Sequence, residues 1–124
     1  DAILYMLFPN TQVWTGYHGN IVYRFLPNGD DHNSCIFETM ILLRYKKGTK
    51  RPDPAEKNIL RPDQAFSEAP EIGGLGPVFD QDDSNMAAVQ KGMIASRKGA
   101  VSLASYQESR IRHLHQTIDK YLNA

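Results

Sequence analysis

An acidic side chain at the start of an apolar helix face is the residue in this chain best placed to do chemistry. Helical spacing from Asp82 leads to three apolar residues, Met86, Val89 and Met93. Residues at i, i+4, i+7 and i+11 share one face of a helix. An apolar face is expected to point into a core, so a carboxylate on it needs a hydrogen-bond donor, a cation or a metal ion as its partner. The spacing therefore predicts an inward-facing Asp82 at the first turn of a helix.

A second interpretation of the same acidic stretch is purely structural. Aspartate is favoured at helix N-caps, and acidic residues are favoured in the first helical turn. Asp80 would then be the N-cap of a helix over residues 80–95, with Asp83 three residues later and Asp82 in solvent. Because a small shift of the helix start exchanges Asp82 and Asp83, the pattern leaves both interpretations open.

The histidines do not complete a metal site by their spacing. His113 and His115 are two residues apart, so on a helix they point roughly 200° away from each other and cannot share a metal ion. His18 is expected in a turn and His32 in a loop, each without a ligand partner nearby in the sequence. If Asp82 binds a metal ion, we expect its other ligands to come from elsewhere.

Size and composition indicate one modest domain of 124 residues with zero net charge. With charges of both signs interspersed, we expect neither nucleic acid nor a membrane surface as a partner. No apolar run approaches the ~20 residues that span a bilayer. The single cysteine, Cys35, excludes an internal disulfide and a cysteine-based cluster, is interpreted as a small buried hydrophobe, and fits a cytoplasmic setting.

The elements that must position these residues divide the chain into a β-rich first third and a helical remainder. The expected strands cover residues 2–8, 11–15, 21–26 and 35–45. Short turns between them favour an antiparallel meander. Residues 46–77 hold five of the seven prolines and are expected to be irregular, with a short helix near residues 63–66. Helices are expected over residues 80–95 and, with an apolar stripe, over residues 105–123.

Four segments of the chain, taken together and in order, resemble one protein family. They are Phe8-Pro9-Asn10-Thr11, Tyr23-Arg24-Phe25-x-Pro27-x-Gly29, Gln81-Asp82-x-x-Asn85-Met86-x-x-Val89-Gln90-x-Gly92 and Tyr106-Gln107-Glu108-x-Arg110-Ile111. The family is that of the Rieske-type aromatic-ring-hydroxylating oxygenases, and the similar part is the C-terminal part of the catalytic domain of the α subunit. The third segment is the most specific of the four.

The resemblance implies an α+β fold of the helix-grip type, also described as START-like or Bet v 1-like. In that fold a curved antiparallel sheet wraps a long C-terminal helix around an apolar cavity. The resemblance also implies mononuclear Fe(II) held by two histidines and one carboxylate, a geometry that leaves positions open for O₂. Asp82 matches the carboxylate ligand, and Asp83 is the alternative.

Neighbours of Asp82 receive their expected roles from the same resemblance. Gln81 and Asn85 would orient the ligand through hydrogen bonds, or would only be solvated at the helix start. The residues that would face substrate, or would instead pack against the sheet, are Phe79, Met86, Val89 and Met93.

Two family motifs have no counterpart in the chain. No two histidines show the Asp-x-x-His-x₄-His spacing, and one cysteine cannot supply the Cys-x-His and Cys-x-x-His pairs of a Rieske cluster. The resemblance therefore implies that residues 1–124 are the C-terminal part of the catalytic domain, truncated at its N-terminus. The Rieske domain and the upstream catalytic segment would be absent, and the chain alone would be inactive.

For the intact protein the resemblance implies an oxygenase of aromatic hydrocarbon catabolism. Electrons from NAD(P)H would pass through a reductase, and in some systems a ferredoxin, to a Rieske [2Fe–2S] cluster and then to the mononuclear iron. A homotrimer or an α₃β₃ assembly would hydroxylate or dihydroxylate an aromatic or other apolar substrate. The alternative is a non-catalytic helix-grip domain that binds an apolar ligand.

Overall fold

The computed structural model describes residues 3–16 and 19–124 and has the α+β composition that the sequence predicts. The chain forms two compact units. The sheet unit contains residues 1–44 and 101–124, and the helical unit contains residues 45–100. His18 and the expected strand start at Ala2 lie outside the described residues. No helix in the described part of the chain is both long and apolar enough to cross a membrane.

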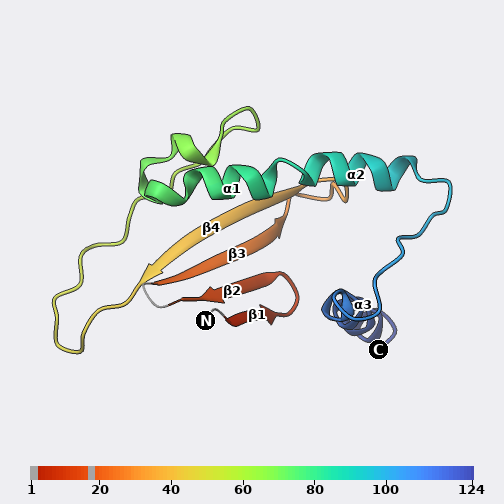
Figure 1. Ribbon diagram of the computed structural model, residues 1–124, viewed down its shortest axis with the longest axis horizontal. Helices are drawn as coiled ribbons and strands as arrows, with labels where there is room; N and C mark the ends of the chain where they lie inside the picture. The colour runs from red at the N-terminus through yellow and green to blue at the C-terminus, as the bar shows by residue number, and fades with distance from the viewer. Residues whose placement is uncertain (1–2, 17–18) are drawn as a thin grey trace. The chain divides into compact units, whose positions relative to one another are not determined.

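The sheet unit is built on an open, antiparallel, four-stranded meander (Figure 1). Its strands are β1 (Ile3–Leu7), β2 (Thr11–Thr15), β3 (Gly19–Pro27) and β4 (Cys35–Leu43), and they lie in the order β1-β2-β3-β4. The prediction of a meander joined by short turns is therefore confirmed. The helix-grip arrangement of the whole domain remains a prediction.

The register of the two long strands places aromatic side chains on one face of the sheet. Phe25 lies opposite Phe37, and their rings stack with centroids 4.9 Å apart. Tyr23 meets Phe37 edge-on at 5.2 Å and is buried. The opposite face carries the cross-strand pair of Arg24 and Glu38, in which Arg24 Nε donates to Glu38 Oε2 over 2.7 Å. The structure thus shows which side chains share each face of the sheet, an assignment that a one-residue shift of the strand register would invert.

A hydrogen-bonded turn joins β3 to β4. Asn33 N and Ser34 Oγ donate to the Asp31 carboxylate over 2.9 and 2.7 Å, and Asn28 Nδ2 donates to Ser34 Oγ over 3.0 Å. Gly29 has a φ of 59°, a conformation that favours glycine. The Ser34 hydroxyl and then the Asn33 amide hold the pKa of Asp31 below its ordinary value.

Helix α3 (Ser109–Leu122) begins four residues later than the sequence predicts. The reason is local: the Glu108 carboxylate accepts from Ala104 N, and the Arg112 guanidinium donates to the carbonyls of Ala104 and Ser105. These bonds hold residues 104–108 in turns ahead of the helix.

Helix α3 lies beside the edge strand β1 within the sheet unit (Figure 1). The rings of Tyr121 and Phe8 stack with centroids 4.8 Å apart. Arg110 Nη1 donates to the Leu4 carbonyl over 3.3 Å. The polar contact therefore joins the helix to β1, and the aromatic contact joins it to the residue that directly follows β1.

The helical unit contains two 3₁₀ segments followed by two helices. They are η1 (Phe66–Glu68), η2 (Pro70–Leu75), α1 (Gly76–Asp83) and α2 (Met86–Ala95). The short helix expected near residues 63–66 thus lies slightly later, at residues 66–68. The prediction of a single helix over residues 80–95 is wrong at its start, which lies at residue 76, and in its middle, where the helix is interrupted. Pro77, in the first turn of α1, suits a helix start, and no N-cap forms at Asp80.

The interruption between α1 and α2 falls at Ser84 and Asn85. Ser84 Oγ donates to the Gln81 carbonyl over 2.7 Å, a local bond that competes with the helix. Both interrupting residues keep right-handed helical dihedral angles, so α2 continues in nearly the direction of α1 (Figure 1).

The core of the helical unit forms around Phe79. Its side chain is fully buried and meets the Phe66 ring edge-on, with centroids 6.0 Å apart. A Cβ atom on Gly76 would lie 2.6 Å from Ser67 Cα, so only glycine allows α1 to approach η1 this closely.

Candidate metal and substrate sites

Asp82 lies in the last turn of α1, not in the first turn of a long helix. Its side chain is exposed, and Val89 and Met93 on α2 are 57% and 45% exposed. The prediction of an inward-facing apolar stripe headed by Asp82 is therefore wrong for this structure, because Asp82 lies at the end of α1 and the side chains of Val89 and Met93 are exposed. The assignment of Asp82 as a metal ligand rests on the motif and remains a prediction.

The three carboxylates of the acidic stretch have different surroundings. Asp80 Oδ1 accepts from Phe66 N over 2.5 Å, and both Asp80 oxygens accept from Ser67 N over 3.3 Å. Asp82 and Asp83 are exposed at the C-terminal end of α1, where the helix carbonyls carry partial negative charge. This end of the helix therefore favours a cation, and Asp82 and Asp83 are the exposed carboxylates of the stretch.

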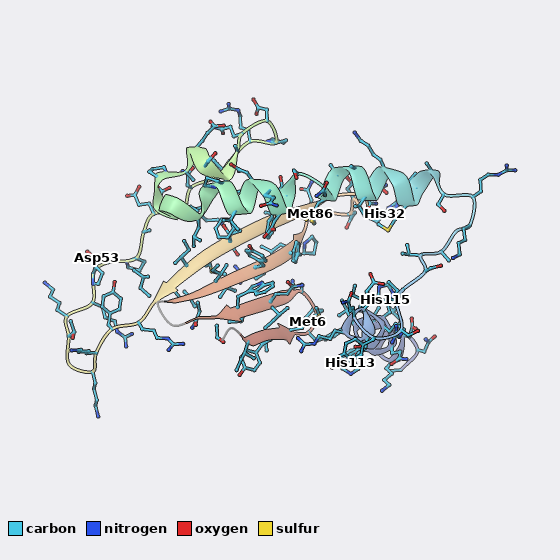
Figure 2. The ribbon with its side chains drawn as sticks, in the orientation of Figure 1. Met6, His32, Asp53, Met86, His113 and His115 are labelled. Carbon is cyan, nitrogen blue, oxygen red and sulfur yellow. The ribbon has the colours of Figure 1, made fainter. Side chains whose placement is uncertain are left out.

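The residues predicted to support Asp82 lie close to it along the chain. Gln81 and Asn85 are exposed, and the Asn85 carbonyl accepts from Val89 N over 2.9 Å at the start of α2. Their role in orienting a ligand remains a prediction. Phe79 packs in the core, as one of its two interpretations proposed, whereas Met86 is half-buried and labelled beside the junction of α1 and α2 in Figure 2.

The described residues do not by themselves fit a site with two histidines and one carboxylate. His32 lies in the β3–β4 turn, where its Nε2 is 3.2 Å from Asn33 Nδ2. His113 and His115 lie on α3 and are exposed (Figure 2). Within residues 3–16 and 19–124, no group of three histidine, cysteine, aspartate or glutamate side chains is arranged to hold a metal ion.

Cys35 is exposed at the start of β4, so its interpretation as a buried hydrophobe is wrong. It follows the polar β3–β4 turn directly, and the strand ends on either side of such a turn face solvent. A single thiol there has no partner for a disulfide within the chain.

Two apolar hollows lie in the sheet unit, for which the resemblance implies an apolar cavity beside the C-terminal helix, but their lining residues were not predicted. The larger, of about 340 Å³, lies between β1 and α3 and is lined by Leu4, Tyr5, Met6, Phe8, Arg110, His113, Leu114 and Thr117. The smaller, of about 220 Å³, is lined by Met6, Pro9, Asn10, Thr11, Gln12, Phe25 and Leu114. Met6 and Leu114 belong to both, so the two hollows adjoin. The segment Phe8-Pro9-Asn10-Thr11 could have indicated these hollows from the sequence, because it is one of the segments that resemble the family and each of its residues lines one hollow.

A comparison with protein families identifies the family of the chain. The family model for the ring hydroxylating alpha subunit (catalytic domain) matches residues 1–124. No curated protein and no solved structure matched the chain. Because the family match covers the whole sequence, the chain belongs to the family of ring-hydroxylating α-subunit catalytic domains.

Proposed function

We propose that this chain is the C-terminal part of the catalytic domain of a Rieske-type oxygenase. The intact enzyme would use Fe(II) and O₂ to hydroxylate or dihydroxylate an aromatic or other apolar substrate. The observation that carries the proposal is the family match over residues 1–124. The segment Gln81-Asp82-x-x-Asn85-Met86, which resembles the family's segment with the carboxylate ligand, supports it.

Asp82 is the proposed carboxylate ligand of the iron. The motif selects Asp82, and Asp83 is the alternative. Asp80 has a structural role, because its carboxylate accepts hydrogen bonds from the backbone of η1. Gln81 and Asn85 would orient the Asp82 carboxylate. The two histidine ligands would come from outside residues 1–124, because no two histidines of the sequence have the spacing of the family's ligand pair. When bound, the iron would supply the activation of O₂.

The apolar hollows of the sheet unit support an apolar substrate. Met6, Phe25 and Leu114 present hydrocarbon and aromatic surface to them. Met86 and Val89 on α2 are further candidates for contact with the substrate. Pockets for small molecules are commonly lined in this way, with few polar groups.

Cofactors and partners follow from the proposed reaction. A Rieske [2Fe–2S] cluster outside this chain would receive electrons that originate from NAD(P)H, through a reductase and in some systems a ferredoxin. The intact protein would be a cytoplasmic homotrimer or an α₃β₃ assembly.

The iron assignment is tested by comparing three variants of the intact subunit. We expect Asp82→Ala to lose the mononuclear iron, measured by metal analysis, while the electron paramagnetic resonance signal of the Rieske cluster is retained. Asp83→Ala is the matched control and should keep both. Asp80→Ala should reduce stability and leave the iron in place.

The same measurement separates the enzyme from its alternative. If Asp83→Ala loses the iron and Asp82→Ala does not, the ligand is Asp83. If the wild-type intact protein binds no mononuclear iron, the oxygenase proposal fails. The apolar hollows would then favour a non-catalytic domain that binds an apolar ligand, which a fluorescent apolar probe would detect.

A further inference from the structure

Eight consecutive residues that follow β4 carry five positive side chains and no negative one. This basic loop, residues 44–51, contains Arg44, Lys46, Lys47, Lys50 and Arg51. The next stretch, residues 53–83, carries eight acidic residues and two basic ones. The expectation that charges of both signs are interspersed is therefore wrong, because a neutral total conceals two oppositely charged segments.

The backbone of the basic loop is turned, which spreads its side chains into solvent. Thr49 N donates to the Lys46 carbonyl over 3.1 Å, and Gly48 has a φ of 84°. Pro52 follows the loop and restricts the chain at its end. All five cationic side chains are exposed.

The positive charge of the loop is not neutralised within the described part of the chain. Ion pairs there include Arg24 with Glu38 and Arg61 with Asp63, outside the loop. Within residues 3–16 and 19–124, no carboxylate pairs with the remaining cations of the loop, Lys46, Lys47, Lys50 and Arg51. Arg44 donates to the neutral Asn20 amide oxygen over 3.3 Å. Five like charges repel one another, so an acidic surface is the complementary partner.

We propose that the basic loop docks the acidic face of the protein that delivers electrons to this oxygenase. The inference rests on the proposed function. Electron-transfer complexes have small, short-lived interfaces, and local charge steers their association more than buried apolar area does. A single exposed loop with five cations fits that requirement. In each encounter one electron leaves the donor protein and enters the oxygenase.

The acidic stretch that follows the basic loop favours a compact acidic protein, and not an extended polyanion, as the binding partner of the loop. Asp53 lies two residues after Arg51 and is labelled just beyond the basic loop in Figure 2. A nucleic acid or an anionic membrane would extend past the loop and meet this negative charge. An acidic patch of limited size on a protein can contact the loop alone.

The test uses the intact oxygenase and the electron-donor protein that reduces it. We expect Lys47→Glu to lower the second-order rate constant of reduction by the donor by roughly 10-fold at low salt, the lower end of the range for steering by local charge. The double variant Lys46→Glu and Lys47→Glu should lower it further. The difference from wild type should shrink as salt rises, because screening weakens the attraction. Lys120→Glu, an equal charge change on α3, is the control and should leave the rate near that of wild type.

Single turnover after chemical reduction separates the two proposals: the oxygenase is reduced with dithionite without O₂, the excess dithionite is removed, and product is measured after O₂ and substrate are added. The docking proposal stands if wild type and Lys47→Glu form product equally after reduction with dithionite, while the donor protein reduces only Lys47→Glu slowly. Equal rates of Lys47→Glu and wild type with the donor would overturn it while the proposed function survives. Binding to heparin or to vesicles containing phosphatidylserine that falls in Lys47→Glu, at an unchanged donor rate, would also overturn it. Absence of product after dithionite reduction of wild type would instead contradict the proposed function.

Discussion

The carboxylate of Asp80 accepts a hydrogen bond from the backbone N–H of Phe66, a residue fourteen positions earlier in the chain. The bond joins the middle of α1 to the first turn of η1, and Ser67 N donates to the same carboxylate. An acid that the sequence suggested as an N-cap for its own helix thus caps a different segment. Within the acidic stretch, Asp80 is therefore a residue that stabilises the fold of the helical unit.

Replacing Asp80 should destabilise the helical unit. A hydrogen bond to a charged group contributes about 1.5–3 kcal/mol, and for this half-buried carboxylate we expect Asp80→Ala to lower the free energy of unfolding by about 1–2 kcal/mol. Urea unfolding followed by circular dichroism measures the change. Asp83→Ala, which removes an exposed carboxylate three residues later, should alter stability by less than about 0.5 kcal/mol. Equal losses in the two variants would show that general charge, and not the bond to Phe66, stabilises the unit.

Two glycines should respond to alanine with opposite signs. Gly76 already has helical dihedral angles, so the cost of Gly76→Ala is the clash of its Cβ with Ser67. Overpacking of this kind costs about 1–3 kcal/mol. Gly92, inside α2, has nothing within 4 Å of its ideal Cβ, so Gly92→Ala should stabilise the helix by about 0.5–1 kcal/mol. Thermal unfolding of both variants tests the close approach of α1 to η1, which a stabilising Gly76→Ala would disprove.

Helix α3 should depend on its aromatic contact with Phe8, the residue that directly follows the edge strand. An aromatic pair contributes about 0.5–1.5 kcal/mol, and because Tyr121 is 70% exposed we expect Tyr121→Ala to lie at the low end of this range. Hydrogen exchange over residues 109–122 should accelerate in this variant. The matched control is Tyr106→Ala, which removes a ring that is 87% exposed and lies outside the helix. Unchanged exchange in Tyr121→Ala would mean that the stack with Phe8 does not hold the helix.

The β3–β4 turn should weaken in acid. The Ser34 hydroxyl and the Asn33 amide lower the pKa of Asp31 from its ordinary value of 3.8, because both donate to the ionised carboxylate. A lowered pKa in the folded state means that the ionised carboxylate stabilises the turn above pH 3.8, and that this contribution is lost as the pH falls through the folded-state pKa. Carbon-13 NMR titration of the Asp31 carboxyl measures the pKa directly. Ser34→Ala should raise it, whereas Ser34→Thr, which keeps a hydroxyl, should leave it low.

The meander and the amphipathic character of the last helix could be predicted from the sequence because both are local properties. Alternation along strands and turn residues such as Pro27, Asn28 and Gly29 act over a few positions. The motif around Asp82 was likewise visible as spacing, and the role of Asp82 as a metal ligand stays a prediction.

The tertiary structure alone decided where α1 begins, which aromatic face the sheet presents and what each acid contacts. The start at Gly76 depends on a close approach to Ser67, and the role of Asp80 depends on Phe66, neither of which spacing within a helix can reveal. Periodicity defines a face but not what covers it, so a stripe that predicted burial for Asp82 also fits an exposed helix end. The hollow beside Phe8 and Leu114 joins segments about a hundred residues apart, and only the folded chain brings them together.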